Sequence, residues 1–192
     1  MDGASKPLRL FIAVPVTDEV KAEAARSAAE LAKAGADVSW VAPASMHLTL
    51  RFLGSTPAER LPALERALDA AARGRSPFSL EFDHLGFFGA PRAPKVIWAG
   101  VGPGLEPLRS LAAALARALE AEGVPREERP FAAHLTLGRV RSARRSAALL
   151  RALKEGPPPR WTCPVERVAL FSSALSSAGS VHSPLRERRL GD

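Results

Sequence analysis

The tetrapeptide His-Leu-Thr-Leu occupies residues 47–50 and recurs at residues 134–137. The chain contains only four histidines, so chance does not readily place two of them in identical words. Each copy lies in a short apolar stretch with the alternation that is typical of a β-strand. We interpret the repeat as two related strands, and the rest of the chain can be organised around them.

The order of residues within the motif assigns its side chains to two faces. Residues two apart in a strand project from the same face, so His47 and Thr49 point together, as do His134 and Thr136. The leucines between them point to the opposite side. A half-solvated strand would explain one such polar pair, but two matching copies favour a functional cleft lined by all four polar side chains.

The pattern around the motifs also repeats. Each half of the chain is predicted to contain a strand, a helix, the motif strand and a second helix. This predicts a single α+β unit over residues 1–192, with two similar lobes facing each other across a cleft; a doubly wound parallel sheet is the alternative. The predicted strands are 8–16, 38–41, 46–53, 78–88, 96–101, 131–140 and 165–173, and the predicted helices are 17–34, 58–73, 105–122 and 142–154.

Composition narrows the class of protein. With 46% hydrophobic and 24% charged residues, the sequence is typical of a folded globular protein rather than a disordered one. A net charge of +7 favours anionic partners, nucleic acid first. The single cysteine, Cys163, excludes an intramolecular disulfide and indicates a reducing compartment. Without a signal-peptide pattern or a long apolar run, we expect a cytoplasmic protein that spans no membrane.

The motif residues suit acid–base chemistry on a phosphate. Imidazole titrates near pH 6.5, so one neutral and one protonated histidine can act together as general base and general acid. Threonine hydroxyls can hydrogen-bond phosphoryl oxygens as charge accumulates on them. This arrangement requires neither a metal nor another cofactor.

The motifs and their flanks resemble the two-histidine (2H) phosphoesterases, and among them the RNA 2′,3′-cyclic phosphodiesterases, also called 2′-5′ RNA ligases. The resemblance covers most of the chain. Its segments are Leu-Arg-Leu-Phe-Ile-Ala-Val at 8–14, Trp-Val-Ala-Pro at 40–43, His-Leu-Thr-Leu-Arg-Phe-Leu-Gly at 47–54, Gly-Phe-Phe-Gly at 86–89, Val-Ile-Trp at 96–98, Arg-Pro-Phe at 129–131 and His-Leu-Thr-Leu-Gly-Arg at 134–139.

The resemblance implies a fold and a reaction. The fold is two similar antiparallel-sheet-plus-helix lobes with pseudo-twofold symmetry around a central cleft. The reaction is hydrolysis of a 2′,3′-cyclic phosphate to a 2′-phosphomonoester, with reversible 2′-5′ RNA ligation. His134 would be the proton acceptor for the attacking water and His47 the proton donor to the departing 3′ oxygen, although the sequence pattern also permits the reverse assignment. The implied partners are RNA ends or nucleoside 2′,3′-cyclic phosphates, with no obligate protein partner.

Substrate-binding residues follow from the same resemblance. Thr49 and Thr136 carry over as phosphate ligands, and Arg139 matches a family arginine beside the substrate. On a regular strand, however, its odd offset from His134 places Arg139 on the opposite face unless the strand ends or bulges. Arg51, four residues after His47 and on its nominal face, is the comparable candidate in the first lobe.

Departures from the family pattern leave alternatives open. The chain has no tyrosine, and Val181-His182 stands where the family often has one. We interpret His182 as a surface residue of a loose tail, and we assign no role to His84. The alternatives are a non-catalytic RNA-binding module, a metal enzyme with the motif histidines as ligands, and a 2H phosphoesterase for another cyclic phosphate such as an ADP-ribose derivative.

Overall fold

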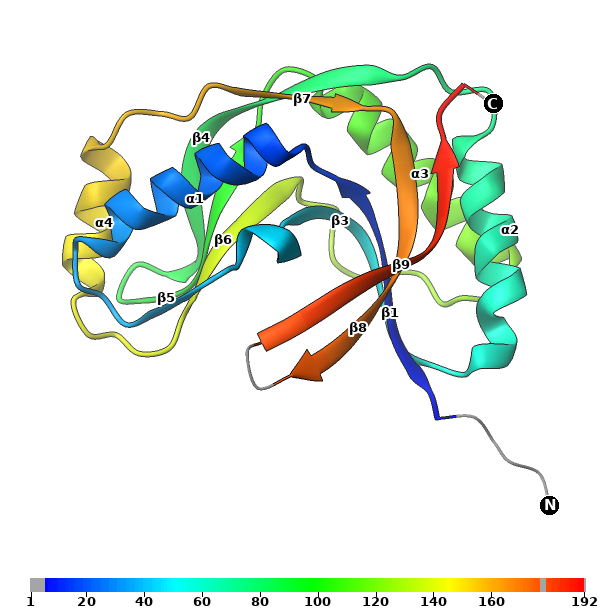
Figure 1. Cartoon of the computed structure of the whole chain (residues 1–192), viewed down its shortest axis with the longest axis horizontal. Helices are drawn as coiled ribbons and strands as arrows, with labels where there is room; N and C mark the ends of the chain where they lie inside the picture. The colour runs from blue at the N-terminus through cyan, green and yellow to red at the C-terminus, as the bar shows by residue number, and fades with distance from the viewer. Residues whose placement is uncertain (1–5, 177–178, 192) are drawn as a thin grey trace.

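The computed structural model describes residues 6–176 and 179–191, which form four α-helices and nine β-strands (Figure 1). Single turns of 3₁₀-helix at Pro43–Ser45 and Ala58–Arg60 precede β3 and α2. The elements are β1 (Leu8–Pro15), α1 (Asp18–Ala32), β2 (Val38–Trp40), β3 (His47–Thr56), α2 (Leu61–Ala72), β4 (Phe78–Ala90), β5 (Ala93–Val101), α3 (Leu105–Ala121), β6 (His134–Val140), α4 (Ser146–Glu155), β7 (Trp161–Val165), β8 (Arg167–Ser176) and β9 (Gly179–Arg189).

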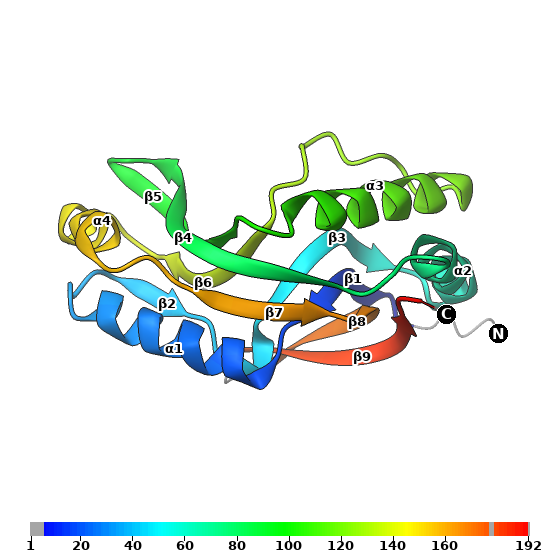
Figure 2. The ribbon, with the colours of Figure 1, turned by 90° about the horizontal axis from the view of Figure 1, so that it is seen from above.

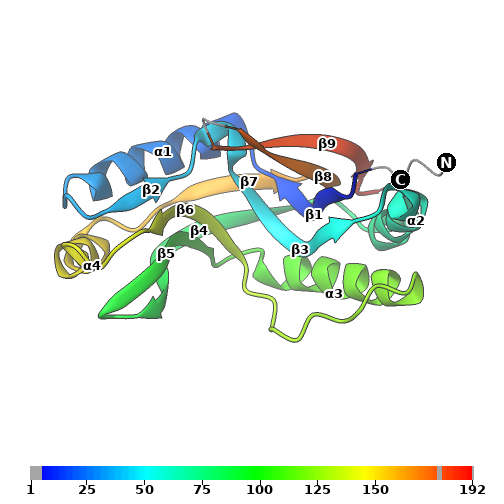
Figure 3. The ribbon, with the colours of Figure 1, turned by 90° about the horizontal axis from the view of Figure 1, so that it is seen from below.

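The strands of the described chain form one sheet in the order β7-β4-β5-β6-β3-β1-β8-β9, with β2 also pairing with β6. Every one of these pairings is antiparallel, which confirms the α+β prediction and rules out the doubly wound parallel sheet. The motif strands β3 and β6 are neighbours at the middle of this order (Figure 3). They pair at Leu48 and Leu135.

The helices divide between the two halves of the sheet. Helices α1 and α4 contact each other and pack against β4, β6 and β7, while α2 and α3 pack together against β3, β8 and β9. Figure 2 shows the two helix pairs at opposite ends of the molecule. Each half-sheet therefore has its own pair of helices, as the two-lobe prediction expects, and the pseudo-twofold relation between the halves stays a prediction.

Apolar spacing explains how the helices pack. In α2 the buried residues recur at helical spacing, which gives one continuous apolar stripe. Helix α1 buries two alanines with its larger apolar residues, and its first turn is capped where the Thr17 hydroxyl accepts a hydrogen bond from the Val20 amide at 3.3 Å. The buried residues of α2 are Leu64, Ala67, Leu68, Ala71 and Ala72.

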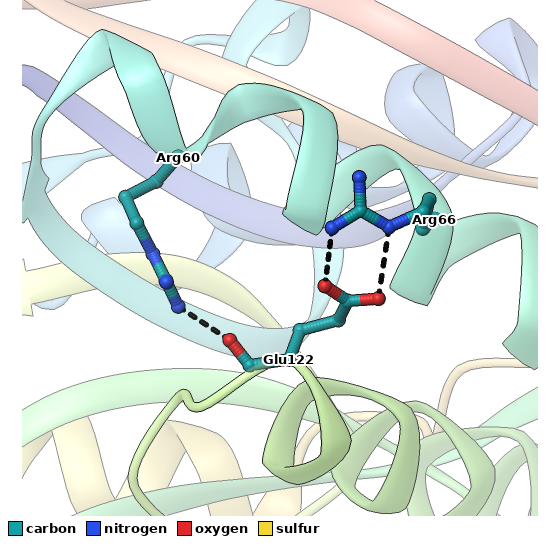
Figure 4. A network of polar contacts seen from close by, with 3 residues as sticks. All are labelled: Arg60, Arg66 and Glu122. Carbon is teal, nitrogen blue, oxygen red and sulfur yellow. Dashed lines mark hydrogen bonds and ion pairs between the residues drawn. The ribbon is translucent and has the colours of Figure 1, made fainter.

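A polar network joins α2 to the end of α3 (Figure 4). Arg66 donates two hydrogen bonds to the Glu122 carboxylate, from Nε to Oε1 at 3.0 Å and from Nη2 to Oε2 at 2.6 Å. Arg60 Nη2 donates to the backbone carbonyl of Glu122 at 2.6 Å. These contacts satisfy a carbonyl near the end of α3, which has no partner within its own helix.

Two strands escaped the sequence prediction for different reasons. Strand β7 contains Pro164, which lacks an amide donor and is tolerated because β7 lies at the edge of the sheet. Strand β9 is rich in serine and arginine and lacks the apolar alternation that marks a half-buried strand. It is the opposite edge, held by extensive pairing with β8.

None of the helices in the described part of the chain combines the length and apolar character needed to cross a membrane.

The leucine pair between the motif strands gives a stability prediction. Leu48 is completely buried, so Leu48→Ala leaves a cavity and should lower the free energy of unfolding by about 2–5 kcal/mol. Urea denaturation followed by circular dichroism measures this change. Leu185 on β9 is 42% exposed and provides the matched control, for which Leu185→Ala should change stability by only about 0.5 kcal/mol. Equal effects of the two substitutions would contradict the anchoring role of Leu48.

Candidate active site

The β3–β6 pairing brings the four polar motif residues together. Leu48 and Leu135 are partners and are fully buried, so the residues on either side of each leucine project from the opposite face of the sheet. Continuing the register by one residue in each direction places His47 opposite Thr136, and Thr49 opposite His134. All four side chains are half-buried. The two histidines thus occupy diagonal corners of one polar patch.

Both catalytic candidates have the same hydrogen-bonded orientation. His47 Nδ1 lies 2.8 Å from the carbonyl oxygen of Ser45, and His134 Nδ1 lies 2.7 Å from the carbonyl oxygen of Ala132. A carbonyl oxygen only accepts hydrogen bonds, so Nδ1 carries the proton in each ring. The Nε2 atoms are therefore the basic nitrogens, left available for proton exchange with a ligand.

The His47 ring is packed among aromatic rings. It stacks on Phe11 with ring centres 4.5 Å apart, and Phe11 in turn stacks on Phe171 at 5.2 Å. His182 meets both His47 and Phe11 edge-on, each at 5.0 Å. This packing fixes the plane of the His47 imidazole and removes water from one side of it.

Burial lowers the pKa of His47 to about 4, because the charged imidazolium is poorly solvated there. The nearby His182, His134 and Arg139 lower the pKa further by positive charge, and the hydrogen bond to the Ser45 carbonyl opposes the shift. His47 is accordingly neutral at physiological pH while the site holds no anion.

His134 has a related but distinct environment. Phe88 on β4 meets the ring edge-on at 4.9 Å, and Trp98 on β5 lies 6.5 Å away. Burial lowers the pKa of His134, the hydrogen bond to the Ala132 carbonyl opposes this, and the charge of Arg139 lowers it further. Both histidines therefore rest in the neutral form in the unliganded protein.

A β-bulge returns Arg139 to the face of the histidines. Relative to β5, strand β6 contains one extra residue, Leu137, between Thr136 and Gly138. Beyond such a bulge the alternation of side chains is inverted, so Arg139 lies on the same face as His134 despite its odd offset. Arg139 is exposed and is close enough to both motif histidines to lower their pKa values.

A bulge in β3 has the opposite effect on Arg51. Leu50 is the extra residue relative to β1, so Arg51 leaves the face of Thr49. Its guanidinium donates a hydrogen bond to the Pro125 carbonyl and lies 3.6 Å from the Glu127 carboxylate. The prediction that Arg51 shares the face of His47 is wrong, because it assumed an unbroken strand. Among the described residues, no side-chain hydrogen bond or ion pair joins the Arg51 guanidinium to the motif quartet of His47, Thr49, His134 and Thr136.

Phe52, rather than Arg51, projects from the face of the sheet that carries His47 and Thr49. It stands five residues after His47, as Arg139 stands five residues after His134, and each follows a bulge at the motif's last leucine. The Phe52 side chain is 60% exposed and lies 6.3 Å from Phe11. The equal spacing of Phe52 and Arg139 from their histidines can be read from the sequence. That both residues project from the face of the histidines follows only from the bulges.

His182 is the other residue that the sequence interpretation misplaced. It belongs to β9 and is half-buried against His47, so the assignment to a loose tail is wrong. The Ser45 hydroxyl donates a hydrogen bond to the Ser180 carbonyl at 3.0 Å, which ties β9 to the turn before His47. His182 Nδ1 is buried and has no hydrogen-bond partner among the described residues.

Potential metal ligands are not clustered in the described chain: no three side chains of His, Cys, Asp or Glu gather there as they would around an ion.

Comparison with known proteins gives one consistent family. Residues 14–175 match the 2′-5′ RNA ligase superfamily. A Thermotoga maritima protein named RNA 2′,3′-cyclic phosphodiesterase is 32% identical over 180 residues, which is 94% of each chain. An Escherichia coli protein of the same name is 30% identical over 187 residues, covering 95% of this chain and 96% of the relative.

Solved structures agree with the sequence matches. The crystal structure of E. coli LigT in apo form superposes with a TM-score of 0.78 at 29% identity, covering 98% of this chain and all of that one. A structure of LigT complexed with 3′-AMP gives a TM-score of 0.74 at 28% identity, covering 97% and 99% of the two chains.

The contact between His182 and His47 yields a prediction about proton affinity. His182→Phe keeps an aromatic ring in place and removes the positive charge that disfavours protonation of His47. The pKa of His47 should therefore rise above about 4 but stay below 6.5, because its burial remains. NMR titration of the imidazole C–H resonances measures this shift. His84→Phe is the matched control and should leave the His47 titration in place; an unchanged His47 pKa in His182→Phe would refute the coupling.

Proposed function

Because this chain belongs to the 2′-5′ RNA ligase superfamily, we propose that it is an RNA 2′,3′-cyclic phosphodiesterase that produces 2′-phosphomonoester ends. One structural observation carries the proposal: two histidines with matching orientation share a polar patch with two threonines and one arginine. The two-histidine arrangement can supply both proton transfers of the reaction without a metal. The whole chain works as a single bilobal domain around this patch.

The proposed reaction uses the two sides of the patch in sequence. The cyclic phosphate binds between His47 and His134, where the hydroxyls of Thr49 and Thr136 and the guanidinium of Arg139 meet its oxygens. His134 Nε2 takes a proton from water as the water oxygen attacks phosphorus. The bond from phosphorus to the 3′ oxygen breaks, and His47 Nε2 donates a proton to that oxygen. The product is a 2′-phosphomonoester with a free 3′ hydroxyl.

The acid must acquire its proton in the complex. With a pKa of about 4 in the empty site, His47 is almost entirely neutral near pH 7. A bound phosphate anion stabilises the imidazolium and raises the pKa of His47, since opposite charges favour the charged form. Substrate binding is therefore coupled to uptake of the proton that catalysis uses.

The proposed substrates are RNA ends and nucleoside 2′,3′-cyclic phosphates. Relatives carrying the name of this activity cover nearly the whole chain, and the related LigT structure complexed with 3′-AMP shows that a homologous fold holds a nucleotide. The net charge of +7 favours an anionic polymer. Reversible 2′-5′ ligation belongs to the same proposal, because it exchanges water for a 5′ hydroxyl as the nucleophile. We place the enzyme in the cytoplasm, consistent with its single, unpaired Cys163.

Replacing either motif histidine should suppress turnover. His47→Ala removes the acid and His134→Ala removes the base, so each should lower kcat for a nucleoside 2′,3′-cyclic phosphate by about 10²–10⁴-fold. Chromatographic quantification of the 2′-nucleotide product measures the rate, with and without a strong chelator, and thermal unfolding confirms that each variant is folded. A near-normal rate in either folded variant would exclude the paired-histidine mechanism, and loss of wild-type activity in chelator would favour a metal enzyme.

The lowered pKa values also predict a specific pH dependence. A general acid must be protonated, so activity falls as pH rises through its pKa. The decrease of kcat/KM with rising pH reports the ionisation of His47 in the free enzyme. It should begin in the acidic range, since the pKa of His47 is about 4 in the free enzyme. For kcat the limb reports the substrate complex and should lie at higher pH, because the phosphate raises that pKa. Initial rates between about pH 4 and pH 9 test this; coincident limbs would contradict proton uptake on binding.

A further inference from the structure

The loop that joins α3 to β6 leads directly into His134 (Figure 3). Among the described residues, no backbone-to-backbone hydrogen bond involves residues 125–131 of this loop. Such a loop keeps its position only through its own side chains and the side chains that contact it. The carbonyl of Ala132, which holds Nδ1 of the His134 ring, lies near the end of this loop. The orientation of His134 therefore depends on what fixes the loop.

Arg51 connects this loop to the first motif strand. Its Nη2 donates a hydrogen bond to the Pro125 carbonyl, and its Nη1 lies 3.6 Å from Oε2 of Glu127. The Arg51 side chain is only 13% exposed, so its end of these contacts is largely shielded from water. The guanidinium thus contacts the loop at two points, and it belongs to β3, the strand that begins with His47.

Other contacts hold this part of the loop only weakly. Residues 125–130 are all exposed, and a cavity of about 510 Å³ lies between the loop and β3. The cavity is lined by residues 51–53 and 124–129. The ion pair of Arg126 with Glu120 spans 3.9 Å at the surface, where such pairs contribute little. The Phe131 ring packs against the core and fixes one end of the loop. The Arg51 guanidinium is therefore the main support of the other end.

The bulge at Leu50 creates this connection. The extra residue turns Arg51 away from the face of the motif residues, and the guanidinium reaches the loop instead. The second motif offers no equivalent contact, because the residue four positions after His134 is Gly138, which has no side chain. A Cβ atom at Gly138 would collide with Trp40. The connection therefore runs in one direction, from the first motif to the loop before the second.

We infer that Arg51 is a positioning residue for His134, an inference that rests on the proposed function. By holding the loop at Pro125, Arg51 keeps the Ala132 carbonyl where it accepts the proton of His134 Nδ1 and so leaves Nε2 as the basic nitrogen. The first motif thereby determines the tautomer of the second histidine. His47 needs no such connection, because its carbonyl partner belongs to the 3₁₀ turn immediately before β3.

Nitrogen-15 NMR of the imidazole rings tests this inference, because the two neutral tautomers have different nitrogen chemical shifts. Arg51→Met retains an apolar stem and removes every donor, including the buried Nε that has no partner among the described residues. In the wild-type protein at neutral pH, both motif histidines should be protonated at Nδ1. In Arg51→Met, His134 should become a mixture of tautomers. His47 should keep its single form and serves as the internal reference.

Initial rates with a nucleoside 2′,3′-cyclic phosphate provide the second measurement. Arg51→Met should lower kcat by about 10-fold to 100-fold with little change in KM, because the base is misplaced while the phosphate ligands remain. Arg51→Lys keeps a donor for the Pro125 carbonyl and should restore one His134 tautomer and most of kcat. Arg66→Met is the matched control: it removes a guanidinium bound to a carboxylate at the end of α3 and should change neither measurement.

The tautomer measurement keeps this test separate from that of the proposed function. If wild-type protein hydrolyses no 2′,3′-cyclic phosphate but the His134 tautomer still depends on Arg51, the positioning role stands and the proposed activity fails. A single His134 tautomer in folded Arg51→Met overturns the inference whatever the rate, as does an equal change in Arg66→Met. Thermal unfolding confirms folding, and Arg51→Gln, whose side chain is too short to reach the Pro125 carbonyl, replaces Arg51→Met if that variant does not fold.

Discussion

The pairing of Leu48 with Leu135 is the constraint on which the rest of the site depends. It joins the two halves of the sheet at their boundary and buries one apolar side chain from each motif. Because side chains alternate along a strand, burial of these leucines forces the neighbouring histidines and threonines to the other face. A shift of one residue in this register would bury the polar residues and expose the leucines. Burial of the two leucines in the hydrophobic core thus fixes the positions of the catalytic histidines and the threonines.

The two copies of the motif have diverged immediately beyond the positions they share. Each is followed by a bulge that returns the fifth residue after the histidine to the site face, and this residue is Phe52 in one half and Arg139 in the other. The duplicated backbone therefore presents a cation on one side of the patch and an exposed aromatic ring on the other. An asymmetric ligand with an anionic centre matches this arrangement better than a symmetric one does.

The features that follow from periodicity along the chain could be predicted from the sequence. The features that depend on pairing with a neighbouring strand could not. The motif repeat, the antiparallel α+β class and the grouping of His47 with His134 follow from composition, spacing and resemblance. Bulges do not, because an extra residue is defined only against a neighbouring strand, and this is why Arg51 was assigned to the wrong face. Strand β9 and its His182 were missed because an edge strand without apolar alternation resembles a polar tail.

The electrostatic balance of the site explains how two buried histidines can remain useful. Burial costs free energy only for the charged imidazolium, so the empty site keeps both rings neutral and leaves Arg139 as its fixed charge. An arriving phosphate meets a cation without a competing carboxylate in the quartet and then raises the proton affinity of the rings around it. His182 modulates this response, since a third imidazole at 5.0 Å from His47 opposes its protonation. Burial disfavours protonation of the imidazole when no anion is bound. The same burial strengthens the attraction between the imidazolium and a bound phosphate, because little water screens the two charges.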